Sequence, residues 1–256
     1  MVFTPDELVQ LVQIYLWPFL RISAMMLAAP IFSASYFNVR VRVILGLTIA
    51  VLIVPLLPAT TAVDPLTPIG LVLALREIAI GLVMGFVMQL VFGAVVVAGH
   101  SVAMSMGLGF AMSIDPQNGV QVPVVSQLNV VFSTLLFLAI DGHLMLLAAV
   151  VESFSVMPIG AASATDSIFA SVVALGSQLF ASALLLGLPT LTAILMINVA
   201  FGVITRAAPQ LNIFAVGFPV TIIAGFLFMF LALPTFLTAM RRFLELGLEQ
   251  TLLVLT

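Results

Sequence analysis

The chain has 256 residues, of which 63% are hydrophobic and only 7% are charged, with a formal net charge of −3. A soluble domain of this size carries roughly a quarter charged residues, so the composition excludes an ordinary soluble protein. Arginine supplies all of the basic charge and cysteine is absent, which also excludes a basic nucleic-acid surface, disulfides and thiolate metal sites.

The charged residues are spaced so that long stretches carry none. A helix of about 20 apolar residues spans a bilayer, and lipid forces each span to close its own backbone hydrogen bonds. We therefore predict an all-α membrane protein, with one domain over residues 1–256 because no polar stretch is long enough for a second. The expected helical elements lie near 6–29, 40–58, 69–100, 124–150, 167–204 and 213–240.

Several of these elements are expected to be bent or broken. The first begins with Thr4 as N-cap, Pro5 at the first helical position and Glu7 closing a capping box, which is not the pattern of a signal peptide. The uncharged run 78–114 would be about 55 Å long as one helix, so we expect it to bend or to end early. Asp141-Gly142-His143 predicts a turn between helices.

Prolines mark further breaks in the apolar runs. Pro18 and Pro189 lie inside runs and predict kinks. Pro30, Pro58, Pro123, Pro158, Pro209 and Pro234 follow or interrupt runs. The pattern favours hairpins of broken helices over a plain series of spans.

Two stripes of small and polar residues are candidates for helix packing. Small residues at i+4 spacing let a second helix approach closely, and a polar one adds a hydrogen bond. The first stripe is Gly81, Gly85, Gln89 and Gly93; the second is Asn198, Gly202 and Arg206, running into Pro209, Gln210 and Asn212. Packing within the chain and packing against a partner subunit are both compatible with the first stripe. Arg206 fits either a helix-end residue or a partner for an acid on another subunit.

The segment 104–119 is the most unusual part of the chain, because it is rich in glycine and yet apolar. Its predicted functional residues are Met106, Gly107, Gly109, Phe110, Met112, Asp115, Pro116 and Gly119. Irregular apolar backbone at membrane depth needs protein or a cavity around it, and methionine fills irregular gaps. The residues by themselves favour an interfacial loop anchored by Phe110, with a deformable seal as the alternative.

No catalytic constellation is visible, so we predict a protein that is not an enzyme and needs no cofactor or metal. The acids Asp115, Asp141, Glu152 and Asp166 have no base nearby in the sequence. Arg21 lies within the first apolar run, where a charge is a functional hint. It is the best candidate site for the alternative function, a small-solute or ion secondary transporter of six broken helices. Arg76 and Glu77 are neighbours that do not face each other on a helix, so each needs another partner.

Three segments in this order resemble the flagellar branch of the FliR/SctT family of type III secretion export-gate proteins. They are Gly107–Gly119, Phe137–Leu144 with Ser153, Phe154 and Pro158 after it, and Arg206–Phe214 with Gly217-Phe218-Pro219. The resemblance covers nearly the whole chain.

The resemblance implies a channel subunit rather than a transporter. Members of the family co-assemble with FliP-like and FliQ-like subunits, near FlhB-like and FlhA-like proteins, into an export gate in the inner membrane of the flagellar basal body. The exported cargo is unfolded flagellar protein. Many of the apparent spans are then bent hairpins packed against partners. Segment 107–119 matches the plug of the family. The resemblance therefore favours a deformable seal over an interfacial loop for this segment.

Overall fold

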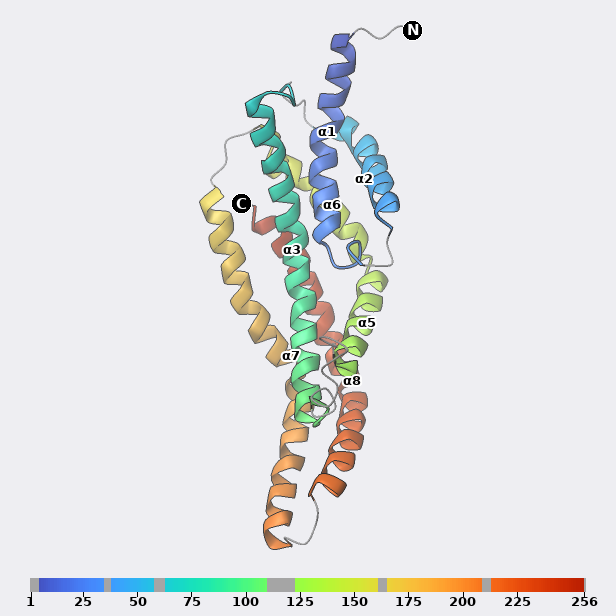
Figure 1. The fold of residues 1–256 in the computed structure, drawn as a ribbon, viewed down its shortest axis with the longest axis vertical. Coiled ribbons are helices and arrows are strands. Elements are labelled where there is room, and N and C mark those ends of the chain that lie inside the picture. Colours follow the sequence, from blue (N-terminus) through green and yellow to red (C-terminus); the bar gives the residue numbers. More distant parts are fainter. Residues whose placement is uncertain are drawn as a thin grey trace. The chain divides into compact units, whose positions relative to one another are not determined.

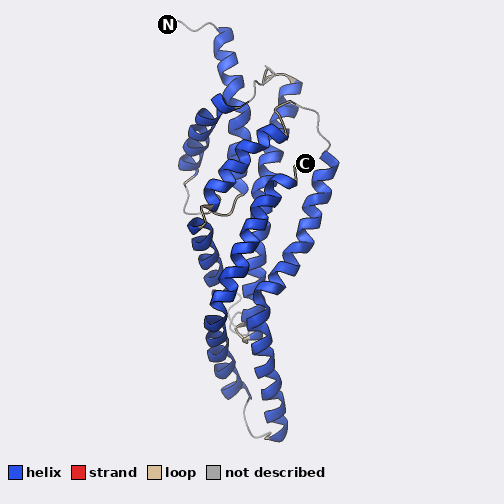
Figure 2. Ribbon diagram, turned by 180° about the vertical axis from the view of Figure 1, so that it is seen from behind, coloured by secondary structure: helices blue, strands red, loops and turns tan. Residues whose placement is uncertain are grey.

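The computed structural model describes residues 5–34, 38–57, 63–109, 123–160, 165–208 and 213–255. Every regular element in these ranges is helical (Figures 1 and 2). In chain order they are α1 Pro5–Ala28, α2 Val39–Ile53, the 3₁₀ helix η1 Val54–Leu56, α3 Pro68–Ser105, α5 Val124–Ala139, α6 Gly142–Val156, α7 Thr165–Ala207 and α8 Ile213–Leu253. The predicted all-α architecture is confirmed.

Four helical segments are long and apolar enough to cross a membrane: Val39–Leu56, Pro68–Ser105, Ala170–Ala207 and Val216–Leu253. The pair α5 and α6 passes the same test together, with a bend of 65° between its two members. The described residues therefore hold four candidate spans, or five if the bent pair is one span.

The predicted break near Asp141 is confirmed and divides the fourth expected element into α5 and α6, but it lies at Ile140 and Asp141, since Gly142 and His143 already belong to α6. Asp141 adopts a left-handed backbone conformation with φ of 57°. L-residues with a side chain visit this region rarely, and aspartate is among those that tolerate it. A strong local turn thus overrides an apolar run that hydropathy alone would read as one helix.

Two helix ends differ from the expectation. α3 continues to Ser105, beyond the expected end near residue 100, and α8 continues to Leu253 instead of ending near residue 240. Pro219 and Pro234 lie inside α8, and Pro18 and Pro189 lie inside α1 and α7. The expected end of α8 was too early because its apolar run stops at Arg241 and Arg242, whereas the helix continues as long as its hydrogen bonding does. α3 likewise continues past Gly99, where the glycine-rich sequence had favoured an early end. The expected helix start at Thr4 lies outside the described residues, and α1 begins at Pro5.

The chain forms two compact units. Unit 1 comprises residues 1–90, 141–176 and 244–256, and unit 2 comprises residues 91–140 and 177–243. In unit 1, α1 packs along α2, as Figure 1 shows in blue, and also contacts α6. In unit 2, the second half of α3 packs against α5, α7 and α8 around a buried apolar cluster.

Close helix packing in both units depends on glycines. A Cβ on Gly81 would collide with the Arg21 carbonyl oxygen, and one on Gly85 would lie 2.6 Å from the Met25 carbonyl oxygen, so α3 meets the backbone of α1 directly. In unit 2, a Cβ on Gly99 would lie 2.5 Å from the Cα of Ser126 on α5. A methyl group at any of these positions would push two helices apart.

Candidate functional site

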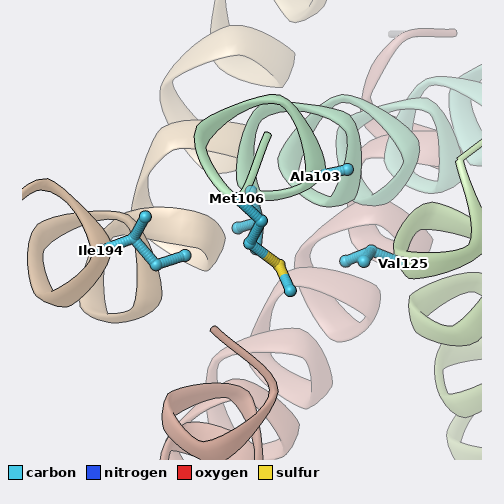
Figure 3. Close-up of a cluster of buried hydrophobic side chains, with 5 residues drawn as sticks. Ala103, Met106, Val125 and Ile194 are labelled. Carbon is cyan, nitrogen blue, oxygen red and sulfur yellow. The ribbon is translucent and has the colours of Figure 1, made fainter. Parts of the chain in front are cut away.

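The C-terminal end of α3 is held in the core of unit 2 by Met106. This side chain is fully buried and extends from α3 into the space between α5, α7 and α8 (Figure 3). Its buried neighbours in the cluster are Val102, Ala103, Val125 and Ile194. On the α8 side, a Cβ on Gly225 would lie 2.6 Å from Met106 Cγ, so the methionine packs against bare helix backbone there.

Two polar side chains from other helices reach the carbonyls of Ser105, the last residue of α3, and of Met106, which follows it. The final four carbonyls of a helix have no partner within it. Asn198 of α7 donates from Nδ2 to the Ser105 carbonyl oxygen at 3.2 Å. The Thr221 hydroxyl of α8 lies 3.1 Å from the Met106 carbonyl oxygen and 3.0 Å from the Phe218 carbonyl oxygen of its own helix, so it shares its proton between them. Both helices of the α7–α8 pair thus hold the end of α3.

Gly107 turns the chain away from this anchored end. Its φ is +85°, in the left-handed region where glycine carries no steric penalty. An added Cβ would also lie 2.6 Å from the ring of Phe218. Gly109 is different, because its Cβ would meet only the flexible tip of the Met104 side chain. The position after Met106 therefore requires glycine for two independent reasons.

Unit 1 contains a second polar centre, around Arg21 of α1. The guanidinium and the Glu77 carboxylate of α3 form a salt bridge of 2.7 Å, and both side chains are fully buried. Arg21 also donates to Ser153 Oγ at 3.0 Å and to the Met157 carbonyl oxygen at 2.9 Å. The ring of Phe154 lies 4.1 Å from the guanidinium carbon. One cation therefore joins α1, α3 and α6.

Residues 12–247 match the family model described as bacterial export proteins, family 1. The chain belongs to this family. Its relatives include the flagellar biosynthetic protein FliR of Pectobacterium carotovorum subsp. carotovorum, which is 38% identical over 236 residues covering 91% of this chain and 88% of the relative. The FliR of Escherichia coli strain K12 is 37% identical over 231 residues, covering 90% and 88%. The FliR of Bacillus subtilis strain 168 is 26% identical over 247 residues, covering 95% of both chains.

Membership of the FliR family confirms the resemblance read from the sequence. The predicted seal residues divide into two groups in the structure. Met106, Gly107 and Gly109 are described, whereas Phe110, Met112, Asp115, Pro116 and Gly119 lie outside the described residues. Met106 is a core residue of unit 2. Sealing by the segment stays a prediction.

The first packing stripe of this FliR-family chain faces two different environments. Gly81 and Gly85 contact α1 of the same chain, which agrees with packing within the chain, one of the two alternatives for this stripe. Gln89 is exposed, and a Cβ on Gly93 would lie 3.3 Å from Leu179 Cδ1 within unit 2. Contact of the stripe with a partner subunit stays a prediction.

The second stripe is more open. Asn198 donates a hydrogen bond to the Ser105 carbonyl oxygen of α3, but Gly202 has nothing within 4 Å of the place a Cβ would occupy. Arg206 is exposed in the last turn of α7, and Pro209, Gln210 and Asn212 lie outside the described residues. Gly202 and Arg206 are therefore available for a partner in the described part of the chain.

The transporter alternative depended on the charge of Arg21, which the structure pairs with Glu77. Sequence reasoning predicted a partner on another helix for Glu77, which is confirmed, but did not connect it with Arg21. The only available signal was that both charges interrupt apolar runs. With Arg21 enclosed by Glu77, Ser153 and Met157, it does not present a free binding group.

Proposed function

We propose that this chain is a non-enzymatic subunit of the type III protein export gate of a bacterial flagellum, in the inner membrane at the basal body. The observation that carries the proposal is the family match over residues 12–247, together with FliR relatives that align along about nine tenths of their length. The apolar helical structure is consistent with a channel component.

The proposed partners are FliP-like and FliQ-like subunits, with FlhB-like and FlhA-like proteins in the same apparatus and unfolded flagellar proteins as cargo. The surface of the chain supports an assembled state, because many large apolar side chains on α2, α7 and α8 are exposed, among them Leu52, Val199 and Phe230. A membrane covers some of this surface, but exposed Gly202 and Arg206 on α7 fit a packed helix better than lipid.

Co-expression tests the assembly. A tagged form of this chain, produced with the FliP-like and FliQ-like proteins of the same organism, should purify in detergent as one large complex containing all three. The chain produced alone should be poorly stable. A stable particle of this chain that leaves both partners behind would contradict the export-gate proposal and favour the transporter.

We further propose that segment 107–119 helps to seal the resting channel. Support comes from its base: Met106 is buried, Asn198 and Thr221 hold the adjoining carbonyls, and Gly107 redirects the chain. Because the base is fixed, the apolar residues that follow it stay at one position, where they would close a pore by packing and dewetting. An exported polypeptide would then displace the segment at modest cost.

Removal of residues 107–119 should leave assembly intact and make cells leak small ions. Phe110 and Met112 changed together to serine keep the length of the segment and should give the same leak. Met145→Ser is the matched control, because this methionine is 47% exposed on α6, outside the segment. Assembled complexes without any leak would contradict the seal and leave the assembly proposal standing.

A further inference from the structure

A partly open cavity of about 280 Å³ in unit 2 is lined by residues of α3, α5, α7 and α8. Its wall is mostly apolar and includes Phe132, Leu185, Pro189, Phe226, Phe230 and Ala232. No ionisable side chain lines the cavity among the described residues. It lies near the middle of the candidate spans of α7 and α8, and side chains at its rim such as Leu185 and Phe230 are exposed and apolar.

Three polar side chains line this apolar space: Asn129, Thr190 and Thr235. Asn129 of α5 is 8% exposed and Thr190 of α7 is 6% exposed. Neither side chain has a hydrogen bond to any residue in the part of the chain that the structure describes. A ligand in the cavity would give these side chains the hydrogen-bond partner that they lack in the described part of the chain.

A backbone carbonyl next to this wall lacks its usual partner within the helix. Proline has no N–H, so Pro189 cannot donate to the carbonyl of Leu185, four residues before it in α7. Leu185 and Pro189 both line the cavity. The wall therefore offers hydrogen-bond donors and acceptors from the side chains of Asn129, Thr190 and Thr235.

We propose that this cavity binds a neutral, lipid-soluble molecule with an apolar body and one hydroxyl or carbonyl oxygen. A charged ligand would find no counter-charge among the lining residues. A pure hydrocarbon would leave Asn129 and Thr190 unpaired. A hydroxyl or carbonyl oxygen dissolved in the hydrocarbon of a membrane lacks partners there, and the cavity supplies them. This site is independent of the export role.

Photolabelling of the full chain, in whichever complex it purifies, tests the site. The probes are a long-chain alcohol that carries a diazirine and the alkane of the same length with the diazirine but no hydroxyl. Labelled peptides are mapped by mass spectrometry. We expect the alcohol to label the cavity segments of α5, α7 and α8 about tenfold more than the alkane, since it gains one or two hydrogen bonds.

Asn129→Leu, Thr190→Val and Thr235→Val combined should remove this preference, since the triple variant keeps the shape of the wall and loses its side-chain donors. Ala232→Phe should fill the cavity and lower labelling by both probes. The matched control Ala200→Phe adds the same ring at an exposed position of α7 outside the cavity and should change neither. Equal labelling of these segments by alcohol and alkane, or labelling unaffected by Ala232→Phe, would overturn the proposal.

A third probe distinguishes the source of the ligand. A phospholipid with the diazirine on its acyl chain presents an ester oxygen from the bilayer itself. If it labels the cavity segments as strongly as the alcohol and responds to the same variants, the site takes membrane lipid. If the alcohol alone gives the variant-sensitive labelling, the site takes free neutral amphiphiles.

Discussion

Arg21 Nε and Glu77 Oε2 lie 2.7 Å apart, with both side chains fully buried in unit 1. A buried charge without its partner is strongly destabilising, whereas replacement of both partners by apolar residues is often neutral. The pair links α1 to α3 at the point where Gly81 brings their backbones together. Charge pairing and close packing therefore act on the same helix contact.

Arg21→Met should destabilise unit 1 by about 3–5 kcal/mol, because it leaves the Glu77 carboxylate buried alone. Glu77→Met should do the same for the guanidinium. The double variant should recover a large part of the loss, which thermal unfolding of the purified complex would measure. Arg40→Met is the control, since Arg40 is exposed on α2. Losses that simply add in the double variant would show that the two charges do not stabilise each other.

Gly81→Ala should destabilise the contact between α1 and α3 by about 1–3 kcal/mol, as overpacking of a close contact does. Its Cβ would meet the backbone oxygen of Arg21, which cannot rotate away. The comparison is Gly176→Ala, where nothing lies within 4 Å and the change should stabilise the helix by up to about 1 kcal/mol. Unfolding midpoints that move alike in the two variants would contradict the packing found here.

Gly107→Ala should be costly even though Gly109→Ala is not. The first change places an L-residue at φ of +85° and presses a methyl group against Phe218. The strain of the left-handed region alone is about 1–2 kcal/mol. The second change meets only the end of Met104, which can shift. We expect a lower unfolding midpoint, and an ion leak in cells, for Gly107→Ala alone.

Asn198→Leu with Thr221→Val should weaken the hold on the end of α3 by about 1–3 kcal/mol, at about 0.5–1.5 kcal/mol for each hydrogen bond. If this end is the base of a seal, cells with the double variant should leak ions while the complex still assembles. Thr192→Val is a suitable control, because its hydroxyl bonds only to Leu188 of its own helix. If Thr192→Val gives the same leak, the leak does not arise from the loss of the hydrogen bonds to the end of α3.

Gly202→Leu tests whether α7 packs against a partner. The site is open within this chain, so folding should be unaffected or slightly improved. If a partner helix approaches there, the large side chain should abolish purification of the complex with FliP-like and FliQ-like subunits. Normal assembly of the Gly202→Leu chain would remove this position from the predicted interface.

The sequence by itself determined that this protein is an all-helical membrane chain of the FliR family. Long uncharged runs leave helices as the only way to satisfy the backbone in lipid, and the motifs at 107–119, 137–144 and 206–214 are contiguous, so they can be read without a fold. The turn at Asp141 was also readable, because local turn chemistry decides it.

Only the tertiary structure decided which distant residues meet. Arg21 and Glu77 are separated by 56 positions, and Thr221 and Met106 by 115, and no periodicity connects such pairs. The same holds for Met106, whose place in the core depends on α5, α7 and α8 closing around it. Hydropathy describes whether one segment favours lipid or water. A contact between two helices depends on how both of their surfaces pack, and the sequence of one helix does not specify the surface of the other.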